Sequence, residues 1–224
     1  MEGQHLVANR KDGLRKRIIG LARSLLPARV WNWLVKLLRG DRLPDRVYME
    51  RELIPAIARQ GGKVLFVGCQ RYTRHYPALI ERTGRTECWT IDIDPTVARW
   101  GAPGRHVIGG LQDARDHWPP ESFDTIVLNG VFGFGVDSAR DQDEALRVCG
   151  FLLRSGGWLI LGWNIGNDAS EVEPSRLSVL RQNFHPAAFQ GLALPQTFPG
   201  STHVYESFVV GADTDSRGLS ASDS

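Results

Sequence analysis

Two apolar runs, separated by a segment long enough for one helix, constrain the fold of this chain more than any other feature. The first, Val64 to Val67, ends at Gly68, and the second, Cys88 to Ile93, ends among carboxylates. This pattern predicts two parallel strands joined by a helical crossover. Asp92 follows Gly68 by 24 residues, close to the roughly 20-residue offset at which a strand-end acid meets a ribose hydroxyl. The spacing therefore indicates a unit that cradles a nucleotide.

The alternation of apolar runs and helical segments continues along the chain. Strands are predicted at 63–67, 87–93, 105–108, 123–128 and 158–163, with helices at 76–82, 95–100, 111–117 and 140–153. Such alternation implies a parallel sheet with helices on both faces. A helix at 175–183 and a proline-rich passage then lead to a last strand, 203–210. Because a loop reaches this strand, we expect it to run antiparallel, and its weak alternation suggests that it is buried. The predicted fold class is α/β, with a doubly wound, mostly parallel sheet and a C-terminal antiparallel strand.

The chain of 224 residues is long enough for one sizeable core with additions at either end. We predict one folded domain at 46–210, which begins with a helix over 46–60 that Pro55 kinks. Residues 1–45 are expected to form a basic appendage of amphipathic helices. Residues 211–224, rich in Ser, Asp and Gly, are expected to be disordered.

Charge is distributed unevenly. Residues 1–60 carry 13 Lys and Arg against 6 Asp and Glu, whereas the remainder carries 14 against 19. Helical spacing of leucines and tryptophans at 14–25 and 30–38 allows two interpretations: helices that pack on the domain or cover its substrate, or helices that lie on an anionic membrane surface. Nucleic acid is a less favoured partner, because neither an RNA-binding module nor an aromatic strand platform is evident.

Several classes of protein are disfavoured. No apolar stretch approaches the ~20 residues of a membrane-spanning helix, and Arg23 interrupts the apolar run that a signal peptide would need. We therefore expect a cytoplasmic protein, with peripheral membrane contact as the alternative. Cys69, Cys88 and Cys149 share no short spacing, so neither a zinc site nor a disulfide framework is indicated, and no metal constellation is visible.

Four segments carry a family resemblance. The sequence KVLFVGC (Lys63–Cys69) is similar to a first strand with its glycine turn, and WTIDIDP (Trp89–Pro95) to a second strand with a ribose-binding acid. SFDTIVLNGVFGFG (Ser122–Gly135) is similar to a fourth strand with its active-site loop, and LLRSGGWLILGW (Leu152–Trp163) to the turn into a fifth strand. Together they resemble the class I S-adenosylmethionine-dependent methyltransferases over roughly 47–210. The resemblance implies a Rossmann-like fold and S-adenosylmethionine as cofactor.

One motif departs from this family. Gly-x-Gly-x-Gly usually follows the first strand, but here the three positions are Gly68, Gln70 and Tyr72. The first glycine keeps the permissive turn, whereas side chains replace the other two. Gln70 and Tyr72 either point outward, or line the pocket and contact the cofactor, or weaken its binding.

The resemblance also implies roles for individual residues. Asp92 is the expected ribose acceptor, with a helix N-cap as the alternative, although Asp94 fits the capping role better. The backbone amides of Gly68 and Cys69 would favour the cofactor's carboxylate. Further contacts are expected from strand ends and loops: Ile93 and Pro95 beside the adenine, Gln112 or Asp113 at its amino edge, and Asn129 and Gly130 at the end of the fourth strand.

The proposed chemistry is an in-line displacement in which the cofactor's positive charge disappears, so alignment and a dry cavity matter most. The loop 131–135 would form an apolar wall, and a general base is optional: His185, His75 or Asp137 would remove a proton from a hydroxyl. The loop lacks the Asn/Asp-Pro-Pro-aromatic signature of base-directed amino methyltransferases, which argues against adenine or glutamine as acceptor.

The leading hypothesis is an enzyme that transfers a methyl group to an oxygen or nitrogen of a small or carrier-linked metabolite. The alternative is a non-catalytic methyltransferase-like domain that serves as a binding or scaffold protein. A nicotinamide-dependent oxidoreductase is disfavoured, because Gly-x-Gly-x-x-Gly is absent after the first strand.

Overall fold

The computed structural model describes residues 43–168 and 170–211. The chain divides into two units, Met1–Leu43 and Pro44–Ser224. The predicted amphipathic helices at 14–25 and 30–38 and nearly all of the predicted C-terminal tail lie outside the described residues. Pro44 and Asp45, which the sequence placed in the appendage, are part of the first described helix of the second unit.

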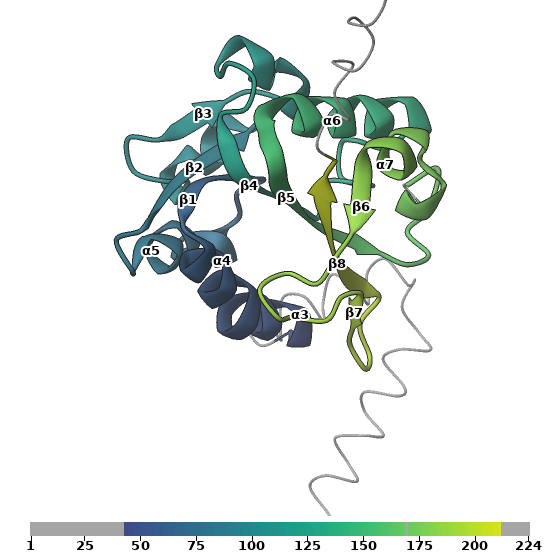
Figure 1. Ribbon diagram of the computed structural model, residues 1–224, viewed down its shortest axis with the longest axis horizontal. Coiled ribbons are helices and arrows are strands. Elements are labelled where there is room, and N and C mark those ends of the chain that lie inside the picture. The colour runs from purple at the N-terminus through teal and green to yellow at the C-terminus, as the bar shows by residue number, and fades with distance from the viewer. Residues whose placement is uncertain (1–42, 169, 212–224) are drawn as a thin grey trace, which may run out of the picture. The chain divides into compact units, whose positions relative to one another are not determined.

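Within the described residues, eight strands form one sheet in the order β3-β2-β1-β4-β5-β8-β6, and β7 also pairs with β8 (Figure 1). β1 to β5 are parallel, and β8 is antiparallel to both β5 and β6. The strands are β1 (Gly62–Val67), β2 (Thr86–Asp92), β3 (His106–Ile108), β4 (Phe123–Asn129), β5 (Leu153–Asn164), β6 (Phe184–Pro186), β7 (Gln196–Thr197) and β8 (His203–Val210). The α/β fold, the doubly wound parallel sheet and the antiparallel C-terminal strand are confirmed.

The strand order reverses between β1 and β4, since β2 and β3 extend the sheet on one side and β5 on the other. In open α/β sheets, ligands bind outside the carboxyl ends of the strands at such a switch point. The fold therefore draws attention to the segments that follow β1, β2 and β4.

The helices cover both faces of the sheet, with α6 and α7 on one face and α3, α4 and α5 on the other (Figure 1). Alternating residues of β1 show why: Leu65 and Val67 pack on the first face, and Val64 and Phe66 on the second. The helices are α3 (Pro44–Tyr48), α4 (Ile54–Gln60), α5 (Tyr76–Glu81), α6 (Ala139–Leu152) and α7 (Ser178–Asn183).

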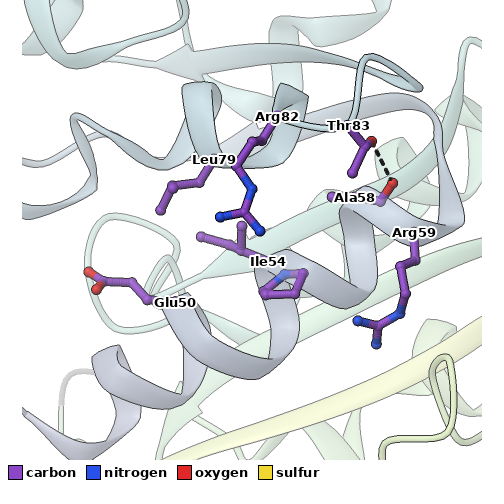
Figure 2. A pocket seen from close by; sticks show the side chains of 8 residues that line it. Glu50, Ile54, Ala58, Arg59, Leu79, Arg82 and Thr83 are labelled. Carbon is purple, nitrogen blue, oxygen red and sulfur yellow. Dashed lines mark hydrogen bonds between the residues drawn. The ribbon is translucent and has the colours of Figure 1, made fainter.

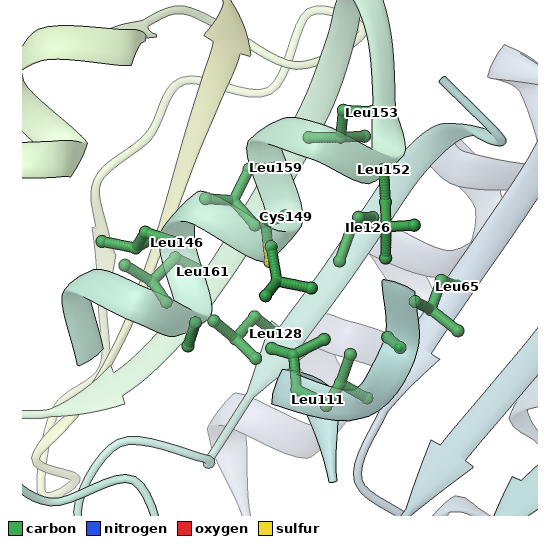
Figure 3. Packing of buried hydrophobic residues seen from close by; sticks show 14 of the residues in the cluster. Leu65, Leu111, Ile126, Leu128, Leu146, Cys149, Leu152, Leu153, Leu159 and Leu161 are labelled. Carbon is green, nitrogen blue, oxygen red and sulfur yellow. The ribbon is translucent and has the colours of Figure 1, made fainter. Parts of the chain in front are cut away.

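α6 supplies most of the helical side of the first core. Ser138 caps it by accepting a hydrogen bond from the Asp141 amide at 3.1 Å. Its buried side chains recur at helical spacing, and Leu146, Cys149 and Leu152 face the leucines and isoleucines of β4 and β5 (Figure 3). Each fully buried leucine of this kind contributes roughly 1.5–3 kcal/mol to folding.

The second core lies under a continuous helical run from Pro44 to Gln60. Between α3 and α4 the chain forms a π-helical turn, η2 (Met49–Leu53), in which the Ile54 amide donates to the Met49 carbonyl five residues earlier. The π-helical turn ends two residues before Pro55, which has no amide to donate, so the irregularity lies beside the position where the sequence predicts a kink.

Some predicted elements differ from those observed. The expected helices at 95–100 and 111–117 are 3₁₀ helices, η4 (Pro95–Trp100) and η5 (Leu111–Asp116), because each connection is only about two turns long. β5 begins five residues earlier than predicted, across a register shift opposite Phe123–Thr125. β6 and β7 were not predicted, since runs of three and two residues carry no periodicity. Among the described helices, none has the length and apolar character needed to cross a membrane.

Candidate active site at the carboxyl edge of the sheet

The turn after β1 and the acid at the end of β2 lie in direct contact. Gly68 has a φ of +89°, which glycine adopts without strain and which carries the chain sharply out of the strand. The next amide, that of Cys69, donates to Asp92 Oδ2 at 2.6 Å. Asp92 Oδ1 accepts from the Asp94 amide at 2.8 Å. The Asp92 carboxylate is thereby fixed beside the turn, and each of its oxygens keeps a lone pair for a further donor.

The space beside the turn is open. A Cβ placed on Gly68 would meet only the Asn129 carbonyl oxygen, at 3.8 Å. The neighbouring Asp94 is the N-cap of η4 and accepts from the Thr96 amide at 2.8 Å. The capping role predicted for Asp94 is thus confirmed. The Asp92 carboxylate does not cap η4 and instead contacts the turn after β1.

The two side chains that replace glycines take different positions. Gln70 is exposed, and its backbone is tied to Thr73, whose hydroxyl accepts from the Gln70 amide at 3.0 Å at the start of η3 (Arg71–Thr73). Tyr72 is half-buried and packs against the second core. The Arg46 guanidinium lies over its ring, with Cζ 3.6 Å from the centroid. Tyr72 is therefore turned toward α3 and does not fill the turn.

Exposed apolar side chains collect at the same edge of the sheet. Among the described residues, five large hydrophobic side chains are exposed, and four of them end or follow β2, β3, β4 and β5: Ile93 (71%), Ile108 (55%), Phe134 (55%) and Ile165 (47%). Exposed apolar groups gathered in one place mark a binding surface more often than scattered ones do. We call these four residues the apolar rim.

A polar network joins the ends of β4, β5 and β8. His203 Nε2 lies 3.0 Å from Asn129 Oδ1, and His203 Nδ1 lies 3.2 Å from Asn164 Oδ1. A neutral imidazole donates from one nitrogen only, so either the ring is protonated or one amide turns its NH₂ group toward it. Gly162 makes room for this network, because a Cβ there would lie 2.1 Å from Asn129 Oδ1.

A cluster of charged and phenolic groups borders the edge on the side of α3. Burial raises the pKa of Tyr205, and the Asp45 carboxylate raises it further. Burial likewise raises the pKa of Tyr76, as do the nearby Glu50 and Asp45. Within the residues that the structure covers, Asp45 Oδ1 and the Tyr76 hydroxyl are buried without a hydrogen-bond partner. Each such unpartnered atom costs about 1–3 kcal/mol, so both atoms have hydrogen-bonding capacity left for a further group.

The predicted catalytic residues do not come together. His75 Nε2 lies 3.0 Å from Glu50 Oε1, beside Tyr76. Asp137 closes the loop after β4 by accepting from the Gly135 amide at 3.0 Å. His185 pairs with Val209, near the last residue of β8, whereas His203 is the first residue of that strand. His185 therefore lies at the amino edge of the parallel strands, away from the turn at Gly68.

The other predicted cofactor contacts lie at the carboxyl edge. Gln112 and Asp113 are exposed on η5, directly after β3, and Asp113 Oδ2 accepts from the Gly110 amide at 3.3 Å. Asn129 ends β4, and the Gly130 amide donates to the Gly162 carbonyl at 2.9 Å. Asp45, Arg46, Tyr76 and His203, which lie at or beside this edge, were not among the residues predicted from the sequence.

A cysteine–histidine contact near the turn is not a nucleophile site. Cys69 Sγ lies 4.0 Å from His106 Nδ1, but burial, reinforced by Asp92, raises the pKa of the Cys69 thiol to about 12. The thiolate that would attack is therefore absent at neutral pH. In the described part of the chain, no group of three or more His, Cys, Asp or Glu side chains is placed to hold a metal ion.

A separate hollow of about 150 Å³ lies between α4 and α5 (Figure 2). It is smaller than the roughly 300–1,000 Å³ of small-molecule sites. The Thr83 hydroxyl bridges its walls by donating to the Ala58 carbonyl at 3.1 Å. Ala58 precedes the amino end of β1, and Thr83 precedes the amino end of β2. The hollow therefore extends toward the amino ends of the strands. We place the candidate site at the carboxyl edge because the turn, the Asp92 carboxylate and the apolar rim lie there.

Comparison with known proteins bears on the fold. No protein-family model and no curated protein matches the sequence. Among solved structures, the chain is similar to a TehB-like SAM-dependent methyltransferase from Corynebacterium glutamicum, with 22% identity and a TM-score of 0.55 over 81% of this chain and 96% of that one. It is also similar to the N-methyltransferase NodS from Bradyrhizobium japonicum in complex with S-adenosylhomocysteine, with 15% identity and a TM-score of 0.56 over 77% and 90%. A SAM-dependent methyltransferase from Archaeoglobus fulgidus matches with 13% identity and a TM-score of 0.55 over 80% and 99%.

These similarities show that the chain has the fold of the class I S-adenosylmethionine-dependent methyltransferases. The expectation of a Rossmann-like methyltransferase fold is confirmed, with the strand order and the antiparallel β8 as its structural basis.

Proposed function

We propose that this chain is an S-adenosylmethionine-dependent methyltransferase that transfers a methyl group to an oxygen or nitrogen of a small or carrier-linked metabolite. The observation that carries the proposal is the Asp92 carboxylate, held 2.6 Å from the Cys69 amide beside the open turn at Gly68. The complex of NodS with S-adenosylhomocysteine supports a cofactor of this chemistry for the shared fold.

The residues at the carboxyl edge suit the parts of this cofactor. Asp92 would accept hydrogen bonds from the ribose hydroxyls, since both of its oxygens have lone pairs left. Ile93, with 71% of its surface exposed, would pack on the adenine, and Asp113 would accept from its amino group. The open turn at Gly68 leaves room for the cofactor chain to pass toward Asn129.

S-adenosylmethionine supplies an electrophilic methyl group on a positively charged sulfur. The protein's part is then to align an acceptor atom and to keep water out. Phe134 and Ile165, both of the apolar rim, would cover the acceptor side. Their two loops are packed together, because a Cβ on Gly133 would collide with the Asn167 side chain. An amine that binds in its neutral form needs no base, whereas a hydroxyl does, and His75 and Asp137 remain candidates for that role.

Isothermal titration with S-adenosylhomocysteine tests the proposal. We expect the wild-type chain to bind and Asp92→Ala to bind at least about tenfold more weakly, because a ribose hydroxyl would lose a charged acceptor. Asp94→Ala is the matched control, since the Asp94 side chain contacts η4, and the backbone amide with which Asp94 holds Asp92 is kept in the variant. No binding by the wild-type chain at millimolar ligand, or equal affinity of the two variants, would refute the proposal.

A non-catalytic scaffold is the second candidate, and its motive is that side chains stand at positions 70 and 72, where the resembled family usually has glycines. If they obstruct the cofactor, the double variant Gln70→Gly, Tyr72→Gly gains affinity for S-adenosylhomocysteine. If they belong to a working pocket, the double variant loses affinity. The same titration therefore separates the two functions.

For the basic N-terminal segment, we propose that it gathers an anionic or membrane-associated substrate. Its support is the excess of 13 basic over 6 acidic residues in 1–60. Co-sedimentation with vesicles of neutral lipid, and of neutral lipid plus phosphatidylserine, measures this. Equal sedimentation with both vesicle types would count against the proposal.

A further inference from the structure

Two adjacent residues of opposite charge, Asp45 and Arg46, stand beside the altered glycine loop. Arg46 lies over the ring of Tyr72, with Cζ 3.6 Å from its centroid, a geometry in which the aromatic face attracts the cation. Tyr72 occupies the third position of the altered Gly-x-Gly-x-Gly motif. The side chain that replaces glycine thus holds a guanidinium beside the loop that follows the turn.

Asp45 lies among the tyrosines of the same region. Its carboxylate raises the pKa of Tyr72, Tyr76 and Tyr205, in each case in addition to the effect of burial. Arg46 lowers the pKa of Tyr72 and Tyr76. Both charges therefore act on the same phenolic groups, and they do so next to Asn129 at the end of β4, whose side chain hydrogen-bonds Tyr205.

Two buried polar atoms of this cluster lack partners among the described residues. They are Asp45 Oδ1 and the Tyr76 hydroxyl. A carboxylate oxygen only accepts, whereas a phenol both donates and accepts. An ammonium group, with three N–H donors, would satisfy both atoms and would also bring a positive charge to the Asp45 carboxylate.

We propose that Asp45, Arg46 and Tyr76 bind the amino-acid end of the cofactor, with Arg46 taking its carboxylate and Asp45 and Tyr76 its ammonium group. This inference rests on the proposed function. A carboxylate beside a guanidinium is complementary to a zwitterion, and the five N–H donors of arginine allow it to serve more than one partner. In this arrangement Tyr72 contributes to cofactor binding by positioning Arg46, whereas the glycine usual at this position contributes by leaving space for the cofactor.

Entry of the ligand requires α3 to shift, because the two unpartnered atoms are covered. No residue of α3 is fully buried, so the shift exposes little of the core. The neighbouring η2 anchors the run by burying Met49 and Leu53. The shift that the proposal needs is therefore one of the end of the run that carries Asp45 and Arg46, on the near side of this anchor.

The test compares two ligands by isothermal titration. S-adenosylhomocysteine carries the amino-acid end, whereas 5′-deoxy-5′-methylthioadenosine shares its adenosine and thioether but lacks that end. For Arg46→Gln and for Asp45→Asn, we expect at least about tenfold loss of affinity for the first ligand. Affinity for the second ligand should stay within about threefold, which also reports that the variants are folded.

Two further variants sharpen the test. Arg51→Gln removes an exposed arginine of the same helical run and should leave both affinities unchanged. Tyr72→Phe should preserve S-adenosylhomocysteine binding, because the ring persists, whereas Tyr72→Leu should weaken it as Arg46→Gln does.

Equal losses for both ligands, or no loss for either, would overturn the assignment of the amino-acid end while the proposed function stands. If the wild-type chain binds neither ligand, the proposed function fails and this inference with it.

Discussion

Substitution of Gly162 by alanine tests whether the network of β4, β5 and β8 is packed as described. Gly162 lies opposite Tyr205 across the β5–β8 pair. A Cβ at this position would lie 2.1 Å from Asn129 Oδ1, 2.9 Å from His203 Nε2 and 2.9 Å from a ring carbon of Tyr205. Asn129 belongs to β4, whereas His203 and Tyr205 belong to β8, so no single side-chain rotation relieves all three contacts.

The cost has two parts. Overpacking a well-packed site typically costs 1–3 kcal/mol, and displacing Asn129 breaks its 3.0 Å hydrogen bond with His203, worth about 0.5–1.5 kcal/mol. Together they give about 1.5–4.5 kcal/mol of lost stability. For a domain of this size, each kcal/mol lowers Tm by roughly 2–4 °C, so we expect the Tm of Gly162→Ala to be lower by about 3–18 °C.

Thermal unfolding followed by circular dichroism measures this, with Gly150→Ala as the matched control. Gly150 lies inside α6, and the nearest atom to its Cβ position is a ring carbon of Phe184 at 3.8 Å. Alanine is the better helix former by roughly 0.5–1 kcal/mol, so Tm should hold or rise. Equal Tm values for the two variants would refute the packing described for Gly162.

Two further predictions concern titration. Burial raises the pKa of the Cys69, Cys88 and Cys149 thiols to about 12. At pH 8 the folded protein should therefore react with a disulfide reagent far more slowly than the urea-unfolded chain. One fast-reacting thiol in the folded state would contradict this. Burial also raises the pKa of Glu206, against the opposing effect of the Trp163 N–H that donates to it at 2.7 Å. The resulting loss of stability grows as the pH rises above 4.5, the ordinary pKa of a glutamate. Glu206→Gln should therefore raise Tm at pH 8 but not at pH 4. An equal gain in Tm at both pH values would disprove this explanation.

The contact between the turn at Gly68 and the Asp92 carboxylate was largely predictable from the sequence, because both residues belong to one strand–helix–strand unit. The apolar run Val64–Val67 ends at a glycine whose φ is positive, and the acid one crossover later lies against the next amide. Parallel pairing of β1 with β2 brings their carboxyl ends together, and it does so for any length or orientation of the helix that connects them. Adjacent elements joined by one crossover leave few alternatives.

The rest of the site was not predictable in the same way. Asp45 and Arg46 meet Tyr72 and Tyr76 through tertiary packing of a helical run, and no spacing in the sequence records that contact. His203 is different, because an antiparallel last strand was expected there, and the start of such a strand lies beside the carboxyl ends of its parallel neighbours. That signal was present in the sequence, and it would have favoured His203 over His185.

The outer strands of the sheet bear on self-association. β3 has three residues, and β6 has three that end in Pro186, which cannot donate to a further strand. Over the described residues, the sheet thus offers at either side too short a row of backbone donors and acceptors for another polypeptide to extend it. Pairing of strands at these two sides is therefore a poor route to assembly for the described part of the domain, which leaves its side-chain surfaces as the better one.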